Sequence, residues 1–253
     1  MLDLFKLRKN HGYQAVPDLK NAKLMETHRG FPVIDQSKWT GDSAAYEDVC
    51  PTGAIKFEPL SIDLGKCIFC GECERVFPEG AIKFTSQFKL GNSDRNNLTV
   101  AAGQTFESYY AEAIKSEKEI HRVFGRSLKL RQVSAAGCNG CELELNACSN
   151  VNFDMGRFGI DFVASPRHAD GIVITGPVSK NMAPALIDAY KSVGDPKIVV
   201  AIGACAISGG LFAESDELNR AFFDEIKIDL FVPGCPPHPL TFINAVLDFI
   251  GRK

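Results

Sequence analysis

The second half of the chain alternates between short apolar runs and longer segments of helical periodicity. Five segments are apolar, or alternate apolar and polar positions, as strands do; they lie near residues 128–133, 160–164, 171–175, 197–202 and 229–232. Helical patterns fall near 141–148, 179–193, 215–227 and 239–250. The runs at 171–175 and 198–202 are rich in β-branched residues, as in strands buried on both faces. Residues 127–253 are therefore predicted to form a flavodoxin-like α/β domain with a doubly wound parallel sheet.

The first half carries an internal repeat. The segment VCPTGAIKF at 49–57 reappears as VFPEGAIKF at 76–84, an offset of 27 residues (76 − 49). Two copies indicate a module with pseudo-twofold symmetry rather than a solenoid. Residues 1–33 before it show no regular pattern and contain Pro17 and Pro32. We expect an extended arm there, which either wraps a partner or frays.

Three cysteines in the second copy follow the spacing of bacterial ferredoxins. Cys67, Cys70 and Cys73 form the C-x2-C-x2-C run, and Phe77 stands where a fourth cysteine normally closes it. The position equivalent to Phe77 in the first copy is Cys50. In two-cluster ferredoxins the fourth cysteine of each run ligates the cluster of the other copy. Cys50 therefore completes a set of four, which predicts one [4Fe–4S] cluster in a small α+β ferredoxin-like domain at residues 34–90.

The other cluster site of this repeat has no cysteine left. Its four ligand positions hold Thr40, Ser43, Tyr46 and Phe77. One cluster is thus predicted to be kept and its twin removed. A zinc site is the weaker alternative for the retained cysteines, because tetrahedral zinc usually takes two cysteines from each of two knuckles.

Four further cysteines follow predicted strands. Cys138 and Cys141 come after 128–133, Cys205 after 197–202 and Cys235 after 229–232. The carboxyl ends of parallel strands line one edge of a sheet, so these thiols are expected to meet there. We interpret them as ligands of a second iron–sulfur cluster, and the residues alone leave zinc or unliganded core thiols as alternatives.

Composition excludes several classes of protein. The chain of 253 residues has nine cysteines and begins without an apolar signal segment, which favours a reducing, cytoplasmic compartment and metal binding over disulfides. A formal net charge of −3 gives no indication of nucleic-acid binding. The sequence contains no apolar run long enough to span a membrane and no glycine-rich dinucleotide or phosphate motif.

Six short motifs are spread over residues 127–253: GCNGC at 137–141, RFGI at 157–160, SPRHAD at 165–170, TGP at 175–177, IGAC at 202–205 and VPGCPP at 232–237. With these motifs the region resembles the small subunit of group 4 [NiFe] hydrogenases, which include formate hydrogenlyase and the energy-converting membrane-bound enzymes. The region is also similar to the complex I subunit that holds the terminal cluster. That subunit has two adjacent cysteines, whereas Cys138 and Cys141 have the hydrogenase-type spacing.

The resemblance implies roles for several residues. Cys138, Cys141, Cys205 and Cys235 match the ligands of the [4Fe–4S] cluster proximal to nickel. Glu144 matches a family glutamate beside that cluster, with a role in proton movement or partner orientation, although a plain helix carboxylate explains it equally well. No catalytic residue is otherwise expected on this chain.

The resemblance also implies partners. The Ni–Fe centre lies in a separate large subunit, so this chain would relay electrons through two [4Fe–4S] clusters to a ferredoxin, a formate dehydrogenase or a flavoprotein. Any membrane association would come through partner subunits. The main alternative is a complex I-like electron-relay subunit of a non-hydrogenase oxidoreductase, and the third is a non-redox zinc or scaffold protein.

The remaining expectations concern connecting segments and isolated residues. Residues 91–126 are predicted to be a linker, up to about residue 103, followed by one amphipathic helix over 105–124 that is interrupted at Glu117 and covers apolar surface between the domains. Cys148 is expected to be a buried, unliganded thiol. His168 and His238, near the cluster loops, are interpreted as structural histidines in preference to groups that tune a cluster.

Overall fold

The computed structural model describes residues 2–12, 15–39, 46–115 and 118–252. The strands are β1 (Pro32–Ile34), β2 (Ile55–Phe57), β3 (Leu60–Asp63), β4 (Ile82–Phe84), β5 (Thr99–Ala101), β6 (Leu128–Ser134), β7 (Ile160–Phe162), β8 (Gly171–Thr175), β9 (Ile198–Ile202) and β10 (Leu230–Val232). The α-helices are α1 (Leu2–His11), α2 (Glu72–Val76), α3 (Phe106–Ala113), α4 (Lys118–Phe124), α5 (Gly140–Ala147), α6 (Ala183–Ser192), α7 (Gly203–Ser208), α8 (Ala221–Glu225) and α9 (Pro239–Phe249). Short 3₁₀ helices are η1 (Gln36–Lys38), η2 (Glu47–Val49), η3 (Asn96–Leu98), η4 (Met155–Phe158), η5 (Pro166–His168) and η6 (Gly210–Phe212).

The second half forms a parallel sheet in the order β10-β9-β8-β6-β7. The chain adds β7 on one side of β6 and then crosses back to β8, which is the flavodoxin-like order with its switch point between β6 and β8. The predicted fold class is confirmed, and all five predicted strands are present. The predicted helix at 215–227 is shorter, because Asn219 donates a backbone hydrogen bond to Val178 and the Glu217 carbonyl accepts one from Lys180. These bonds hold the segment before α8 as an extended turn.

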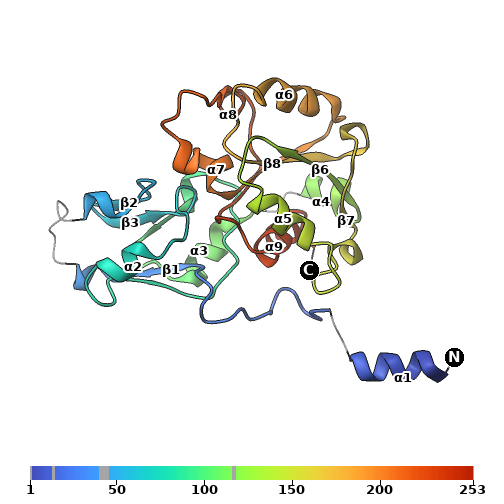
Figure 1. The fold of residues 1–253 in the computed structure, drawn as a ribbon, viewed down its shortest axis with the longest axis horizontal. Helices are drawn as coiled ribbons and strands as arrows, with labels where there is room; N and C mark the ends of the chain where they lie inside the picture. Colours follow the sequence, from blue (N-terminus) through green and yellow to red (C-terminus); the bar gives the residue numbers. More distant parts are fainter. Residues whose placement is uncertain (1, 13–14, 40–45, 116–117, 253) are drawn as a thin grey trace.

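Alternate residues of the central strands face opposite layers of helices. Ile172 and Ile174 of β8 pack in one apolar cluster with Leu186 of α6 and Phe222 of α8. Val173 packs in a second cluster with the helices α5 and α9. The two layers are seen above and below the sheet in Figure 1. Burial on both faces explains why these strands have continuous apolar sequences.

The small domain shows the pseudo-twofold arrangement of the repeat. β1 pairs with β4 and β2 pairs with β3, both antiparallel, and β2 and β4 begin 27 residues apart (82 − 55). The prediction that residues 91–103 form a linker is wrong. Within them, β5 adds a third strand beside β3, because Leu98 and Val100 are apolar residues with fully buried side chains in an otherwise polar stretch.

The segment predicted as one amphipathic helix contains two helices, α3 and α4. α3 ends because Ile114 adopts an extended conformation, and the predicted interruption at Glu117 lies outside the described residues. The expected covering role is confirmed for α3. Phe106 packs on Phe31 of the small domain at a ring distance of 5.6 Å, and the Tyr110 hydroxyl donates a 2.7 Å hydrogen bond to Asp248 of α9.

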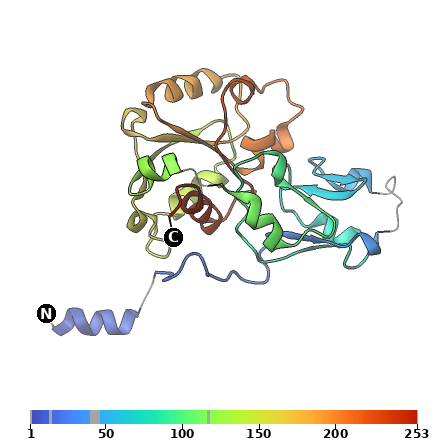
Figure 2. The same cartoon turned by 180° about the vertical axis from the view of Figure 1, so that it is seen from behind.

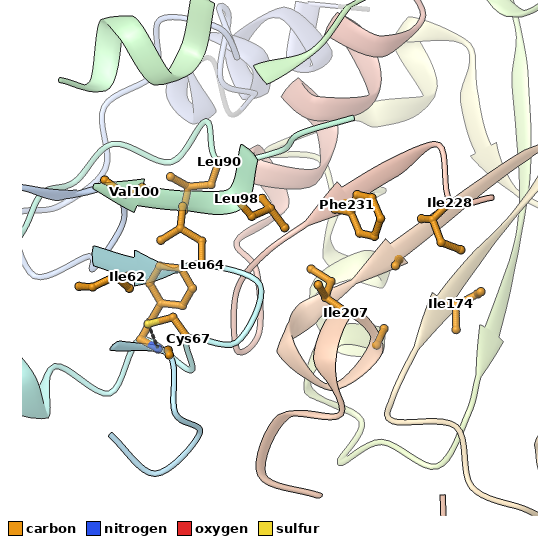
Figure 3. Packing of buried hydrophobic residues seen from close by; sticks show 14 of the residues in the cluster. Ile62, Leu64, Cys67, Leu90, Leu98, Val100, Ile174, Ile207, Ile228 and Phe231 are labelled. Carbon is orange, nitrogen blue, oxygen red and sulfur yellow. Dashed lines mark hydrogen bonds between the residues drawn. The ribbon is translucent and has the colours of Figure 1, made fainter. Parts of the chain in front are cut away.

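The two domains share one apolar core. Leu64 and Leu98 of the small domain belong to the same buried cluster as Ile207 of α7 and Phe231 of β10, and Figure 3 shows these side chains as one layer that crosses the domain boundary. Asn92 also forms an isolated β-bridge with Phe231. Continuous packing of this kind fixes the orientation of the two domains.

The N-terminal segment runs along the body of the molecule after α1, which projects from it (Figures 1 and 2). Val16 donates a backbone hydrogen bond to the Asn152 carbonyl, and Leu19 is buried against the α9 side of the sheet domain. Gly30 then donates to the Thr85 carbonyl of the small domain. The segment therefore contacts both domains of its own chain. No helix among the described residues is long and apolar enough to cross a membrane.

Candidate metal centres

Cys50, Cys67, Cys70 and Cys73, hereafter the module set, line one small cavity of the small domain. Cys50 follows η2, Cys67 and Cys70 lie in the loop after β3, and Cys73 lies in α2. The rest of the cavity is mostly apolar, with Ile55, Ile62 and Phe84 in its wall. The structure thus brings Cys50 from the first copy of the repeat to the three cysteines of the second.

Backbone N–H groups are directed at the sulfur atoms of this set. Ala54 donates to Sγ of Cys50 at 3.2 Å, and Phe69 donates to Sγ of Cys67 at 3.3 Å, the bond marked in Figure 3. Phe69 and Gly71 both have positive φ values, 53° and 77°, which turn the loop tightly around the cavity. N–H···S hydrogen bonds of this kind help to stabilise thiolate ligands and set the reduction potential of iron–sulfur clusters.

Burial determines the electrostatics of the module set. It raises the pKa of Cys67, and the neighbouring thiols add to the effect. Burial also raises the pKa of Cys73, to about 12, and Cys70 and Cys50 contribute. Four mutually repelling thiolates in an apolar cavity are unfavourable without a compensating positive charge. A cationic metal core supplies that charge, so the donor set fits a bound metal centre.

Cys138, Cys141, Cys205 and Cys235, hereafter the sheet-edge set, follow the carboxyl ends of β6, β9 and β10, with Cys141 in α5 and Cys205 in α7. These three segments approach one another at glycines. A Cβ atom on Gly203 would lie 2.7 Å from Sγ of Cys141, and one on Gly140 would lie 3.5 Å from Sγ of Cys138 and 3.6 Å from Pro236. Glycine at these points allows the ligand loops to approach closely.

The four thiols of the sheet-edge set lie within electrostatic range of one another. Burial raises the pKa of Cys141, and Glu142 and the other three thiols raise it further. Burial raises the pKa of Cys205 to about 11, with contributions from Cys235 and Cys138. The four thiols therefore lie near one another at the carboxyl edge of the sheet, as the sequence predicted.

The donor spacing bears on the kind of metal centre. Among the described residues, no three Cys, His, Asp or Glu side chains converge tightly enough to hold a single metal ion. A tetrahedral zinc site needs sulfur atoms about 3.8 Å apart, since each Zn–S bond is about 2.3 Å. Four thiolates can ligate either a zinc ion or a [4Fe–4S] cluster, so the iron and zinc content is the measurement that distinguishes the two.

Two residues near the sheet-edge set were not singled out from the sequence. Glu142 is 5% exposed, and its Oε1 accepts hydrogen bonds from the hydroxyls of Ser134 and Thr175, both 2.6 Å long. Arg220 donates to the carbonyls of Cys205, Ala206 and Pro177. Their partners come from distant strands and loops, so no local sequence pattern could indicate either residue.

The other candidates have ordinary surroundings. Glu144 is half-buried, and burial raises its pKa. Cys148 is fully buried, and its Sγ donates to the Glu144 carbonyl at 3.3 Å. Nδ1 of His238 accepts from the Leu240 N–H and caps α9, which is a structural role, and His168 is exposed in η5. Cys148 therefore has the expected place in the core.

Two of the four positions at which the sequence predicts a lost cluster lie among the described residues. Thr40 and Ser43 lie outside the described residues, whereas Tyr46 and Phe77 pack against Trp39, with ring distances of 5.2 and 5.1 Å. Phe57 stacks on Trp39 at 5.5 Å. Aromatic side chains thus fill the space near the positions that a second cluster would need.

The second half of the chain is similar to subunits of known oxidoreductases. The family model described as NADH ubiquinone oxidoreductase, 20 Kd subunit, matches residues 138–249. The chain is 40% identical over 140 residues to the probable membrane-bound hydrogenase subunit mbhJ of Pyrococcus furiosus, with 54% of this chain and 84% of that protein covered. It is 38% identical over 164 residues to formate hydrogenlyase subunit 7 of Escherichia coli, with 64% and 62% covered.

Relatives of the complex I type also match. An NADH-quinone oxidoreductase subunit of Geotalea daltonii is 40% identical over 116 residues, with 45% of this chain and 68% of that protein covered. A solved structure of the membrane-bound sulfane sulfur reductase, an archaeal respiratory membrane complex, matches 53% of this chain and 75% of its own at 29% identity and a TM-score of 0.46.

The fold and the thiol-lined sheet edge define an electron-transfer subunit of an oxidoreductase, of a class that carries an iron–sulfur cluster. The chain belongs to the family of complex I 20 kDa subunits and [NiFe]-hydrogenase small subunits. The resemblance noted in the sequence is confirmed, and the matched family region, 138–249, covers the sheet-edge set and not the small domain.

Proposed function

We propose that this chain is the electron-transfer subunit of a multi-subunit [NiFe] hydrogenase. In this proposal a partner large subunit holds the Ni–Fe centre, and this chain relays electrons between that centre and an external carrier. The carrier is a ferredoxin, a formate dehydrogenase or a flavoprotein. Any attachment to a membrane is assigned to other subunits of the complex.

The observation that carries the proposal is the presence of two four-cysteine sets on one continuous core. The module set would hold one [4Fe–4S] cluster and the sheet-edge set another, which is the number of ligands that each cluster requires. A bound [4Fe–4S] cluster accepts and releases one electron at a time. The relatives named hydrogenase and formate hydrogenlyase subunits, and the Cys138-x2-Cys141 spacing, support a hydrogenase as the whole enzyme.

The residues of the chain have three tasks in this function. The cysteines hold the metal centres, and the N–H groups of Ala54 and Phe69 orient two of the thiolates. Apolar side chains such as Ile62 and Phe84 exclude water from the module cavity. A packed, preorganised surrounding of this kind lowers the rearrangement that accompanies a change of charge.

The second candidate is a complex I-like electron-relay subunit of an oxidoreductase that does not act on hydrogen. The identity of 40% to the NADH-quinone oxidoreductase subunit of Geotalea daltonii favours it. The spacing of Cys138 and Cys141 is evidence against it, because the complex I-type subunit has adjacent cysteines.

The test is to purify the tagged chain anaerobically with its natural partners and to identify the subunits and metals. The proposal predicts a nickel-containing large subunit. It also predicts that added H₂ reduces the clusters of this chain, so that their EPR signals appear. A large subunit without nickel, and clusters reduced by a different donor but not by H₂, would support the second candidate. Zinc in place of iron would contradict both.

A further inference from the structure

The two thiol sets approach each other at the junction of the two domains. A cavity of about 220 Å³ lies there between the loops that carry them. Its lining includes Phe69 from the Cys67–Cys70 loop and Cys235 and Pro236 from the sheet edge. Burial raises the pKa of Cys235, and the nearby thiols of Cys138 and Cys70 add to the effect. Cys70 of the module set therefore lies close enough to Cys235 of the sheet-edge set for their charges to interact across the junction.

The N-terminal arm supplies the cation at this junction. His28 and Arg29 also line the cavity, and Nε of Arg29 donates a 2.6 Å hydrogen bond to the Phe69 carbonyl. A Cβ atom on Gly71 would lie 3.0 Å from Cδ of Arg29, so the alkyl part of the side chain rests on the ligand loop. Arg29 forms none of the ion pairs found among the described residues.

The position of Arg29 is fixed from both sides. The ring of His28 packs edge-on against that of His238 at 5.7 Å, on the sheet-domain side. Gly30 and Phe31 donate backbone hydrogen bonds to Thr85 and Gln87 of the small domain. Gly30 is required there, because a Cβ atom would lie 1.9 Å from the Gln87 carbonyl oxygen. The arm therefore holds a positive charge at the place where two sets of negatively charged thiolates come together.

We propose that Arg29 is an electrostatic positioning residue for electron transfer between the module set and the sheet-edge set, across the junction of Cys70 and Cys235. This inference rests on the proposed two-cluster function. In the step concerned, one electron leaves the centre on one side, which is oxidised, and reduces the centre on the other side. No bond forms or breaks and no proton moves. A fixed cation favours the more negative, reduced form of both centres, and thus raises their reduction potentials.

The test compares EPR-monitored redox titrations of the wild-type protein with three variants. Arg29→Gln removes the charge, Arg29→Lys keeps it without the planar guanidinium, and Lys83→Gln removes an equal charge from an exposed position on β4. We expect Arg29→Gln to shift the potential of the module centre, and to a lesser extent that of the sheet-edge centre, to more negative values. Arg29→Lys should recover most of the shift, and Lys83→Gln should cause little.

The wild-type protein is also expected to show magnetic interaction between the two reduced centres, as broadened or split EPR signals. Unshifted potentials in Arg29→Gln would overturn the role of Arg29. Two fully loaded but magnetically isolated centres would overturn the junction at Cys70 and Cys235. Each of these results leaves both clusters present, whereas failure of the proposed function would appear as missing iron in the wild-type protein. If Arg29→Gln fails to fold, Arg29→Met takes its place, because it also removes the charge but keeps an alkyl side chain beside Gly71. The same negative shift is expected, and unshifted potentials in Arg29→Met would overturn the role of Arg29.

Discussion

The rings of Tyr46 and Phe77 pack against each other with their centroids 4.7 Å apart. The two residues come from different copies of the internal repeat, and each stands where a two-cluster ferredoxin carries a ligand of its other cluster. Trp39 and Phe57 complete the aromatic group. Aromatic side chains thus occupy two of the positions at which the sequence predicts that a second cluster has been lost.

This packing predicts that Phe77→Cys will not create a second cluster in the small domain. The new thiol would have none of the three other ligands, and the aromatic group would lose a side chain that is 4% exposed. We expect unchanged iron content and a loss of about 2–4 kcal/mol in the free energy of unfolding, measured by denaturant titration. Val76→Cys is the control, because Val76 is the adjacent, exposed residue and should cost little. Additional iron in Phe77→Cys would show that this half of the small domain can still bind a second cluster.

Cys50→Ala should abolish the EPR signal of the module set and leave that of the sheet-edge set. Cys50 reaches the set from the other copy of the repeat, so the crossed ligation depends on this residue alone. Iron content should fall from about eight to about four atoms per chain.

Cys148→Ala is the matched control for Cys50→Ala. Cys148 is fully buried away from both sets, so its truncation should keep all the iron and cost about 1–2 kcal/mol of stability. If Cys50→Ala kept both signals unaltered, the assignment of Cys50 to the module set would be wrong.

Glu142 is predicted to stabilise the ends of β6 and β8, because it accepts hydrogen bonds from Ser134 and Thr175. Glu142→Ala leaves the hydroxyls of Ser134 and Thr175 without their carboxylate acceptor and should lower the free energy of unfolding by about 1–3 kcal/mol. Glu142→Gln keeps an acceptor oxygen and should cost less, while loss of the negative charge beside Cys141 shifts the sheet-edge centre to a more positive potential. Glu144→Gln is the comparison, and an equal loss of stability in Glu144→Gln would contradict this role.

His238 gives a pH dependence of stability. Burial, with His28 beside it, lowers the pKa of His238 to about 4 from an ordinary value of 6.5. The unfolded chain therefore takes up a proton first as the pH falls, so stability is full above pH 6.5 and is lost between 6.5 and about 4. His238→Asn keeps an N-cap acceptor for Leu240 but does not titrate. The wild-type protein should lose about 1–2 kcal/mol relative to this variant over that range, since partial exposure weakens the effect. If the free energy of unfolding depended on pH in the same way in both proteins, His238 would not be the source of the pH dependence.

The strands that build the sheet edge were predictable because burial on both faces requires continuous apolar runs, as in β8 and β9. Strand β5 could not be predicted, because its three residues form a strand by pairing with β3 and show no local strand pattern in the sequence. The shortened helix at 215–227 has a similar cause, since hydrogen bonds to Val178 and Lys180 from a distant loop override its helical periodicity.

The cysteines of the module set were identified from spacing, because a tight loop around a metal centre needs thiols at short, regular intervals. Those of the sheet-edge set were identified from their positions after predicted strands. Residues that support them were not identified in this way. Ser134 and Thr175 are 41 residues apart in the chain (175 − 134) and meet only at Glu142. Arg29 reaches the ligand loop from an arm with no regular pattern. Such contacts depend on the tertiary fold.

In the proposed function, eight cysteines hold two iron–sulfur clusters in one chain. The most direct measurement is the iron, zinc and acid-labile sulfide content of the anaerobically purified wild-type protein, together with the EPR spectrum after reduction. The account predicts about eight iron atoms and about eight sulfides per chain, with signals from two centres. About four iron atoms with a single signal, or zinc in place of iron, would contradict it.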